Sequence, residues 1–282
     1  MNIEGFGMAY VSTMDDASGY MQPMGDQSLG AELTESYNAA SPFPHIVIDD
    51  FLPPEVLDNV LARCDDLQLN EDGVEFDRAQ ERFKRSYQPD SLPDDLRGLF
   101  YSFNSRPFIK LIENITGIKG LIPDPYFFGA GIHEIRQGGH LSVHADFNHH
   151  KVMNLERRIN VLIYLNKDWK PEYGGSLELW DQGMTTLTQN IVPEFNRCVI
   201  FNTTSNSQHG NPHPINHPAG ISRKSIALYY YTSTWDGTKR SHTTQFQVRP
   251  KSADKRDWRV KLGEIKDDVL PPILARALNR VF

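Results

Sequence analysis

The stretch RRINVLIYLNKDWKPEYGGSLELWD, residues 157–181, contains two apolar runs separated by residues that favour turns. Each run has the length of one strand, and Pro171, Gly174 and Gly175 lie between the two. Similar short runs recur from about residue 126 to residue 235, divided by Gly, Pro, Asn and Asp. Several short strands at this spacing predict an antiparallel sandwich or barrel, with the jelly roll included.

The chain before this core predicts a strand and several helices. Residues 45–52 are expected to form the first strand, and residues 53–67 a helix that begins at two prolines. Residues 92–118 predict two further helices. The charged residues 68–91 are compatible with a loop or with a lid. We expect the N-terminal helices to pack on one sheet of the β core.

The two ends of the chain differ in charge. Residues 1–44 contain six acidic residues and no lysine or arginine, which predicts a flexible acidic N-terminal arm. Residues 237–282 predict a connector and a C-terminal amphipathic helix, and the connector has six basic residues between 249 and 261. A single jelly-roll domain is therefore expected over residues 45–236, with its core at 126–235.

Composition narrows the class of protein. The chain has 282 residues, of which 39% are hydrophobic and 23% charged, as in a soluble globular protein with a sizeable core. It has no apolar run long enough to cross a bilayer and no signal-like start, so we expect a cytoplasmic protein without a membrane partner. The net charge of −7 argues against a nucleic-acid partner. Cys64 and Cys198 are expected to be buried free thiols.

The segment HADFNHH, residues 144–150, indicates a metal site. In the run that precedes and enters it, period-two alternation places four polar side chains on one face, namely His140, Ser142, His144 and Asp146. An imidazole and a carboxylate presented together hold a divalent ion, and a third ligand from another strand would complete a facial triad. Three later histidines compete on composition for that place: His209, His213 and His217.

Two later strands offer a carboxylate clamp. In SRKSIALYYYT, Arg223 and Ser225 share one face, and a guanidinium beside a hydroxyl suits a bound carboxylate. In RRINVLIYLN, Asn160, Leu162 and Tyr164 share one face, which adds a phenol and an amide. A metal triad with such a clamp describes a site for a small dicarboxylate that chelates iron at its other end.

This pattern of HxD…H followed by R-x-S resembles the 2-oxoglutarate- and Fe(II)-dependent dioxygenases, most closely their prolyl-hydroxylase-like branch. The likeness extends over roughly residues 126–234, with a weaker likeness in FPHIVIDDFLPPEV near the start. It implies a double-stranded β-helix (jelly-roll) fold and three iron ligands, His144, Asp146 and His209. It also implies that Arg223 and Tyr164 hold the distal carboxylate of 2-oxoglutarate, with Ser225 matching more distant relatives. Many relatives have a tyrosine where this chain has Ile135.

The resemblance implies an oxygenase that uses Fe(II), 2-oxoglutarate and O₂, and releases succinate and CO₂, with ascorbate as an expected assay additive. Because halogenating relatives lack the carboxylate of Asp146, hydroxylation of an unactivated C–H is the expected reaction. No catalytic residue beyond the metal ligands is expected. The substrate would be an amino acid, a peptidyl residue or a small metabolite, and the oligomeric state is open.

Further residues are candidates for contacts in the site. Asn160 is a candidate cosubstrate ligand, while His133, Arg136 and Asn148 are candidate substrate contacts. His149 and His150 are expected to be bystanders. The alternatives to hydroxylation are desaturation or another oxidation at the same site, a non-catalytic metal and 2-oxoglutarate sensor, and a zinc hydrolase.

Overall fold

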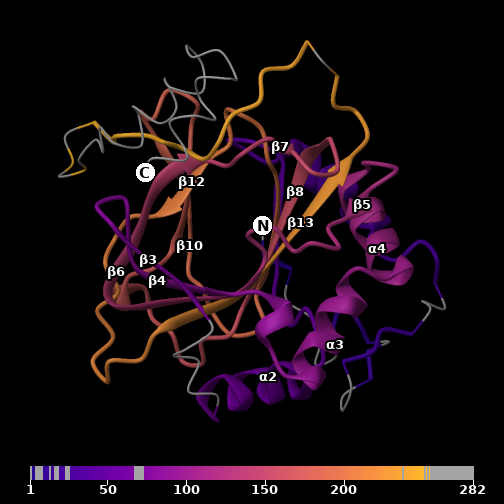
Figure 1. Ribbon diagram of the computed structural model, residues 1–282, viewed down its shortest axis with the longest axis horizontal. Helices are drawn as coiled ribbons and strands as arrows, with labels where there is room; N and C mark the ends of the chain where they lie inside the picture. Colours follow the sequence, from indigo (N-terminus) through magenta and orange to yellow (C-terminus); the bar gives the residue numbers. More distant parts are fainter. Residues whose placement is uncertain are drawn as a thin grey trace, which may run out of the picture.

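The computed structural model describes residues 2–3, 9–12, 14–15, 19–22, 26–66, 73–236, 238–250, 252 and 254. Within these residues, fourteen strands form one curled, mainly antiparallel sheet, and helices cover one side of it (Figure 1). The main path of neighbouring strands is β1 (Asn2–Ile3), β2 (His45–Ile48), β11 (Cys198–Asn202), β8 (Leu155–Tyr164), β13 (Arg223–Thr232), β6 (Gly131–Ala145), β12 (Gln208–Asn211), β9 (Leu177–Trp180) and β10 (Leu187–Ile191). This curled sheet confirms the jelly-roll expectation.

The long strand β6 contributes to both walls of the curled sheet. Residues 131–135 pair with β13, whereas residues 141–144 pair with β12. Between these halves, Gly138 has a φ of 76°, and a Cβ on Gly139 would lie 2.6 Å from the carbonyl oxygen of Arg82. Glycine tolerates both a positive φ and the close approach of another backbone, because it has no Cβ. The chain can therefore pass from one wall to the other, and the walls face each other across a cavity.

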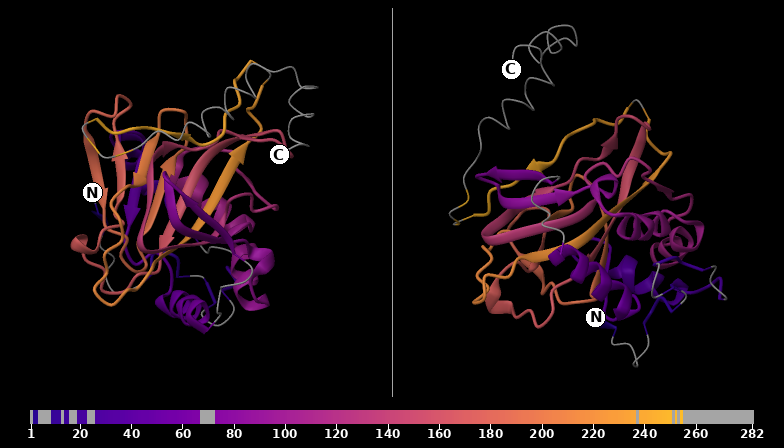
Figure 2. Two further views of the ribbon diagram at one scale, coloured as in Figure 1. Left: turned by 60° about the vertical axis from the view of Figure 1, so that its left-hand side comes forward. Right: turned by 60° about the horizontal axis from the view of Figure 1, so that its bottom comes forward.

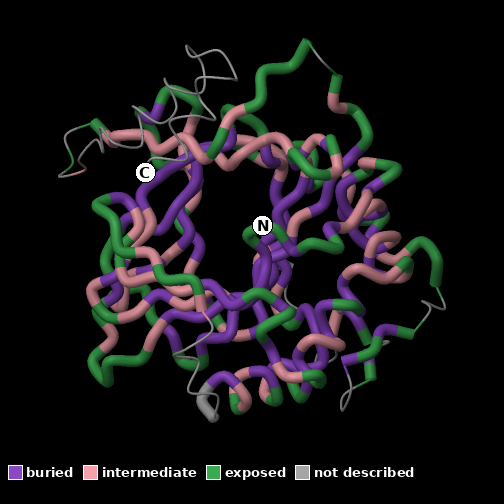
Figure 3. The backbone as a smooth tube through the Cα atoms, viewed as in Figure 1, coloured by how far each residue is buried: buried purple, intermediate pink, exposed green. Residues whose placement is uncertain are grey.

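Alternation along the central strands separates a core from the cavity. On β8, the side chains of Ile159, Val161 and Ile163 join the main hydrophobic core. Asn160 and Leu162, between them, line the cavity on the other side of the strand. Burial of both faces explains why β8, β11 and β13 are mostly buried, as Figure 3 shows at the positions of β8 and β13. The sequence pattern of these strands predicts this arrangement correctly.

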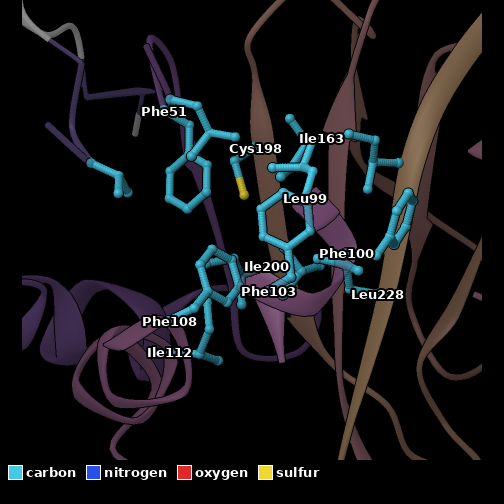
Figure 4. Close-up of a cluster of buried hydrophobic side chains, with 14 of the residues drawn as sticks. Phe51, Leu99, Phe100, Phe103, Phe108, Ile112, Ile163, Cys198, Ile200 and Leu228 are labelled. Carbon is cyan, nitrogen blue, oxygen red and sulfur yellow. The ribbon is translucent and has the colours of Figure 1, made fainter. Parts of the chain in front are cut away.

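Three helices cover the core side of the sheet: α2 (Pro54–Asp66), α3 (Asp94–Phe103) and α4 (Arg106–Thr116). Figure 4 shows Phe100, Phe103 and Phe108 from α3 and α4 packed towards β-strand residues such as Ile163 and Ile200. The helix α4 begins with proline in its first turn and ends at Gly117, whose φ is 73°. These capping residues and apolar faces confirm two helices within residues 92–118.

The N-terminal region differs from the flexible arm that its composition predicts. The 3₁₀ helix η1 (Ala31–Leu33) and the helix α1 (Thr34–Ala39) lie within it. Its apolar side chains join the main core at Val11, Met14, Met21, Leu33 and Tyr37. The described residues of the arm therefore belong to the folded domain, because their burial removes apolar surface from water.

A β-hairpin lies within the charged segment 68–91, which the sequence predicts to be either a loop or a lid. It consists of β3 (Val74–Arg78) and β4 (Glu81–Tyr87), and β4 pairs with β6 along its length (Figure 2). Shorter elements complete the described chain: β5 (Ile122–Pro123), β7 (His149–His150), β14 (Gln245–Phe246), η2 (Pro89–Ser91) and η3 (Pro171–Tyr173). The hairpin extends the sheet beside the strand that bears the HxD motif.

Three other expectations concern the whole chain. The predicted C-terminal helix, and most of the basic segment before it, lie outside the described residues. Cys64 and Cys198 are both buried and form no disulfide, as expected. No described helix has the length and apolar character required to cross a membrane.

Candidate metal centre

A cavity of about 840 Å³ opens between the two walls of the curled sheet. Strand β6 contributes His133, Ile135 and His144 to its lining, and Asp146 follows directly after the strand. His209 on β12 faces the same cavity. The cavity therefore collects most of the polar residues that the sequence singles out.

The metal triad, defined as His144, Asp146 and His209, converges on one point. His144 and His209 are directly paired across β6 and β12, and their ring centres lie 4.5 Å apart. The two carboxylate oxygens of Asp146 lie 3.5 Å from Nε2 of His144 and 3.4 Å from Nε2 of His209. One ligand atom from each residue lies within 4.8 Å of the others. This donor set suits a non-haem iron centre with open coordination positions.

Backbone contacts orient both histidine rings towards that point. Nδ1 of His144 lies 2.9 Å from the carbonyl oxygen of Ser142, and Nδ1 of His209 lies 2.9 Å from that of Ser207. A carbonyl accepts a hydrogen bond, so each Nδ1 carries the proton and each Nε2 presents its lone pair. Burial also lowers the pKa of His209, which favours the neutral imidazole that binds metals.

Asp146 is held by two residues of β8. Its Oδ2 accepts hydrogen bonds from Nδ2 of Asn160 at 2.7 Å and from Nη2 of Arg157 at 3.0 Å. Burial disfavours the ionised carboxylate, but the charge of Arg157 and the contacts with His209 and His144 outweigh burial and hold the pKa of Asp146 well below its usual range. Asn160 thus contacts a residue of the metal triad and also lines the cavity, and its contact with the cosubstrate stays a prediction.

Arg157 is a site residue that the sequence reading did not identify. Its side chain is 1% exposed, and its guanidinium carbon lies 3.6 Å from the ring centre of Tyr229 and 4.3 Å from that of Phe147. A bulge turns it towards the cavity, because Arg157 pairs with Tyr231 while Ile159, two residues later, pairs with the adjacent Tyr230. The pair of arginines at the start of the strand was the available signal.

Arg223 and Tyr164, the residues predicted to form the carboxylate clamp, lie side by side at another part of the site. The guanidinium carbon of Arg223 lies 4.9 Å from the centre of the Tyr164 ring, and Nε donates to the carbonyl oxygen of Gly175 at 2.8 Å. Among the described residues, no carboxylate lies within 4.0 Å of this buried guanidinium, and the buried hydroxyl of Tyr164 has no hydrogen-bond partner. Buried polar groups normally have partners, so these two fit an anionic ligand.

Gly175 makes the position of Arg223 possible. It has a φ of 71°, and a Cβ at this residue would lie 2.4 Å from Cδ1 of Ile215 and 2.9 Å from Cδ of Arg223. The turn role that the sequence assigns to Gly174 and Gly175 is therefore incomplete, since Gly175 also leaves space for the clamp.

Other predicted residues lie near the clamp. Ser225 lines the cavity and pairs with Tyr164 on one side and His133 on the other. Burial, followed by the charge of Lys84, lowers the pKa of His133 to about 3. Ile135 is paired with Arg223 and forms an apolar part of the cavity wall.

Two expected substrate contacts are directed elsewhere. Arg136 forms an ion pair with Glu75 of β3 and is absent from the cavity lining. Nδ2 of Asn148 donates to the carbonyl oxygen of Arg240, and its Oδ1 accepts from the backbone nitrogen of His242. Asn148 therefore fixes the segment next to the cavity that includes His242.

Four further histidines contact residues outside the metal triad. Nε2 of His213 lies 3.0 Å from Oε1 of Glu178, and the ring of His217 packs against Trp169 and Tyr173. Neither belongs to the metal triad. His149 and His150 lie on the cavity lining, although His149 stacks on Trp235 and His150 contacts Asp124. Their position makes them wall residues.

A jelly roll with a convergent His-Asp-His triad agrees with the resemblance to the 2-oxoglutarate-dependent oxygenases. Residues 130–231 match the family model of the 2OG-Fe(II) oxygenase superfamily. The match covers the core of this chain and confirms the resemblance that the sequence motifs indicate. No curated protein sequence matches the chain.

Solved structures support the same fold. A prolyl-4-hydroxylase from Pseudomonas putida has a TM-score of 0.50 at 16% identity, covering 72% of this chain and 98% of that one. A prolyl hydroxylase from Trichoplax adhaerens, in complex with a hypoxia inducible factor peptide fragment, has a TM-score of 0.50 at 17% identity, covering 76% and 94%. The carbocyclase SnoK from nogalamycin biosynthesis has a TM-score of 0.51 at 10% identity, covering 82% and 92%.

Oxygenases of this superfamily use Fe(II), 2-oxoglutarate and O₂. The residues of this chain fit that set, because the metal triad offers two imidazoles and a carboxylate. The clamp provides a buried cation and a buried hydroxyl for the far end of a dicarboxylate.

Proposed function

We propose that this protein is a hydroxylase that oxidises an unactivated C–H bond of an amino acid, a peptidyl residue or a small metabolite. The observation that carries the proposal is the presence, in one cavity, of an intact metal triad and a buried guanidinium without an anionic partner among the described residues. A structural metal site would explain the first feature alone. A dicarboxylate cosubstrate explains both.

In this proposal, His144, Asp146 and His209 hold the metal on one side and leave its remaining positions open. The carbonyl groups of Ser142 and Ser207 maintain the histidine tautomers. Arg157 and Asn160 maintain the orientation and charge of Asp146. Such outer contacts matter because a rotated metal ligand would block an open coordination position or weaken metal binding.

The clamp fixes the other end of 2-oxoglutarate. Arg223 supplies the charge-assisted hydrogen bonds, Tyr164 supplies a hydroxyl, and Ser225 adds a third donor on the same face of β13. The bound cofactors supply oxidation of the substrate with release of succinate and CO₂. The protein contributes geometry, exclusion of water and charge complementarity.

The substrate is proposed to enter between the β3–β4 hairpin and the segment after β7. Phe76 and Lys84 line the cavity on the hairpin side, and Lys151 and Val152 line it on the other. His133 lies on the lining and is proposed as a substrate contact. Its lowered pKa keeps it neutral, so it would contact the substrate by hydrogen bonding and without a charge.

The test combines cofactor binding with product formation. Protein loaded with Fe(II) without O₂ receives 2-oxoglutarate, and the visible charge-transfer band of the complex is recorded for wild type, Asp146→Ala, Arg223→Leu and the exposed control Arg136→Leu. Exposure to O₂ with panels of amino acids, peptides and small metabolites then follows, with succinate and oxidised product measured together.

The expected result is a band in wild type and in Arg136→Leu that is lost in Asp146→Ala and requires far more 2-oxoglutarate in Arg223→Leu. Succinate formation stimulated by one class of substrate would identify that class. A folded, metal-loaded wild type without a band would contradict the oxygenase proposal. A band without succinate under any condition would favour a sensor.

A further inference from the structure

Asn211, at the end of β12, is a buried polar residue that the proposed function has not yet used. Its side chain is 3% exposed and lines the cavity. Its Nδ2 has no hydrogen-bond acceptor among the described residues. Because an amide nitrogen buried without an acceptor is costly, such a group usually signals a missing partner.

The position of Asn211 lies between the metal triad and the clamp. His209 is two residues earlier on the same strand. Antiparallel pairing brings His209 opposite Leu179 and Gly210 opposite Glu178, so the next position places Asn211 beside Leu177. Leu177 also lines the cavity and is two residues from Gly175, whose carbonyl oxygen binds Arg223. A dicarboxylate that joins the metal to Arg223 would pass this point.

Other buried asparagines in the same fold are satisfied by the protein itself. Nδ2 of Asn166 donates to the carbonyl oxygens of Pro193 and Lys224, and its Oδ1 accepts from the backbone nitrogen of Lys224. Asn196 similarly donates to the carbonyl oxygen of Leu52 and accepts from its backbone nitrogen. These residues hold loops and strand ends together. Asn211 makes no comparable bond in the described chain, so a purely structural role does not account for it.

The part of the cavity wall between Asn211 and the clamp is apolar at Leu162 and Leu177 and cationic at Arg223. Asn211 and Arg223 are both buried donors on the cavity lining, and the ring of Tyr164 lies 4.9 Å from the guanidinium carbon of Arg223. An anionic ligand with several oxygens would satisfy these donors together. We propose that the Asn211 amide donates a hydrogen bond to a carboxylate oxygen of bound 2-oxoglutarate, as an additional cosubstrate-binding residue.

This inference rests on the proposed function, so its test must separate the two. The probe is 2-oxoglutarate titrated calorimetrically into protein loaded with Mn(II), which binds oxygen and nitrogen ligands without turnover. The variants are Asn211→Leu, which keeps the shape and removes the donor, Asn211→Ala as a smaller alternative, and Arg223→Leu. Asn190→Leu is the matched control, because Asn190 is exposed on β10.

The expected result is that Asn211→Leu weakens 2-oxoglutarate binding by about 10- to 100-fold, as for loss of a hydrogen bond to a charged group. Mn(II) affinity should remain that of wild type, and Asn190→Leu should bind both normally. Without ligand, the unfolding temperature of Asn211→Leu should equal or exceed that of wild type, because an unsatisfied amide is replaced by an apolar group. Asn166→Leu should instead unfold at a lower temperature.

Three results would overturn the inference. Unchanged 2-oxoglutarate affinity in both Asn211 variants, while Arg223→Leu loses binding, would reject Asn211 and leave the proposed function intact. An equal fall in Mn(II) affinity would assign the effect to the metal triad. Failure of folded, Mn(II)-loaded wild type to bind 2-oxoglutarate would reject the inference together with the proposed function.

Discussion

Arg157 donates a hydrogen bond of 3.0 Å from Nη2 to Oδ2 of Asp146, while its guanidinium lies between the rings of Phe147 and Tyr229. Arg157, which is fully buried, thus fixes the orientation of Asp146, a predicted metal ligand. The aromatic rings shield this ion pair from water and restrict the arginine to one orientation. The bulge in β8 therefore positions the arginine that stabilises the negative charge of Asp146.

Replacement of Arg157 by leucine should weaken metal binding. The variant removes the largest influence that lowers the pKa of Asp146, and burial then raises that pKa. The ionised carboxylate binds the metal, so the contribution of Asp146 to wild-type affinity is lost only as the pH falls through its depressed pKa. The variant should lose affinity at a higher pH, and at neutral pH its Mn(II) affinity should be about 10- to 100-fold lower.

Metal titrations across a pH series would measure this effect, with Arg63→Leu as control because Arg63 forms an exposed ion pair with Asp95. Coincident pH profiles for Arg157→Leu and wild type would show that Arg157 does not set the charge of Asp146.

Substitution of Gly175 by alanine should displace the clamp. The new Cβ would meet Ile215 and Arg223 at distances far below van der Waals contact. We expect a loss of about 1–3 kcal/mol in the free energy of unfolding and a fall in 2-oxoglutarate affinity. Gly220→Ala is the matched control, because Gly220 has a φ of 69° but a Cβ at this residue would enter open space, with no neighbouring atom within 4 Å.

Both glycine variants carry the strain of a positive φ, so their difference isolates the collisions with Ile215 and Arg223. Denaturant unfolding and calorimetric titration would measure the two effects. Equal 2-oxoglutarate affinity in Gly175→Ala and Gly220→Ala would argue against a role of Gly175 in positioning the clamp.

Replacement of Tyr164 by phenylalanine should separate binding from stability. Its hydroxyl is buried without a partner among the described residues, so the free protein should lose no stability on its removal. Affinity for 2-oxoglutarate should fall by roughly tenfold. In Tyr230→Phe the pattern should reverse, because the Tyr230 hydroxyl donates to the carbonyl oxygen of Phe103 at 2.8 Å.

The Tyr230 variant should lose about 1 kcal/mol of stability and bind 2-oxoglutarate normally. Unfolding curves and 2-oxoglutarate titrations on both variants would measure these changes in stability and affinity. If Tyr164→Phe binds 2-oxoglutarate as tightly as wild type, the phenol is not part of the clamp.

Replacement of Arg136 by alanine should leave turnover and substrate affinity close to wild type. Its guanidinium is paired with Glu75 on the outside of the hairpin, and an exposed pair of this kind contributes at most about 1 kcal/mol. His133→Ala should instead raise the KM for the substrate identified in the screen, since His133 lines the cavity. Steady-state kinetics on both variants would measure this contrast, and a raised KM in Arg136→Ala would return Arg136 to the substrate site.

Several features of the site could be read from local sequence. Alternation placed Asn160, Leu162 and Tyr164 on one face of β8, and Arg223 with Ser225 on one face of β13. This works because successive side chains on a regular strand point to opposite sides. The same rule failed at two bulges, one in β8 at Arg157 and one in β6. In β6, His144 pairs with His209 and Leu141 pairs with Asn211, so β6 has one extra residue between these pairs. Leu141 therefore shares the cavity side with His144, whereas His140 contacts the carbonyl oxygen of Ala79.

The sequence by itself determined the faces of the regular strand segments, the helices and the HxD motif, because these depend on backbone geometry over a few residues. The tertiary structure decided which later histidine meets that motif, and it selected His209 through its pairing with His144. It also turned Arg157 towards Asp146 and Asn148 away from the cavity. These outcomes depend on register and bulges, which are set by packing between segments far apart in the chain, and no local pattern contains that information.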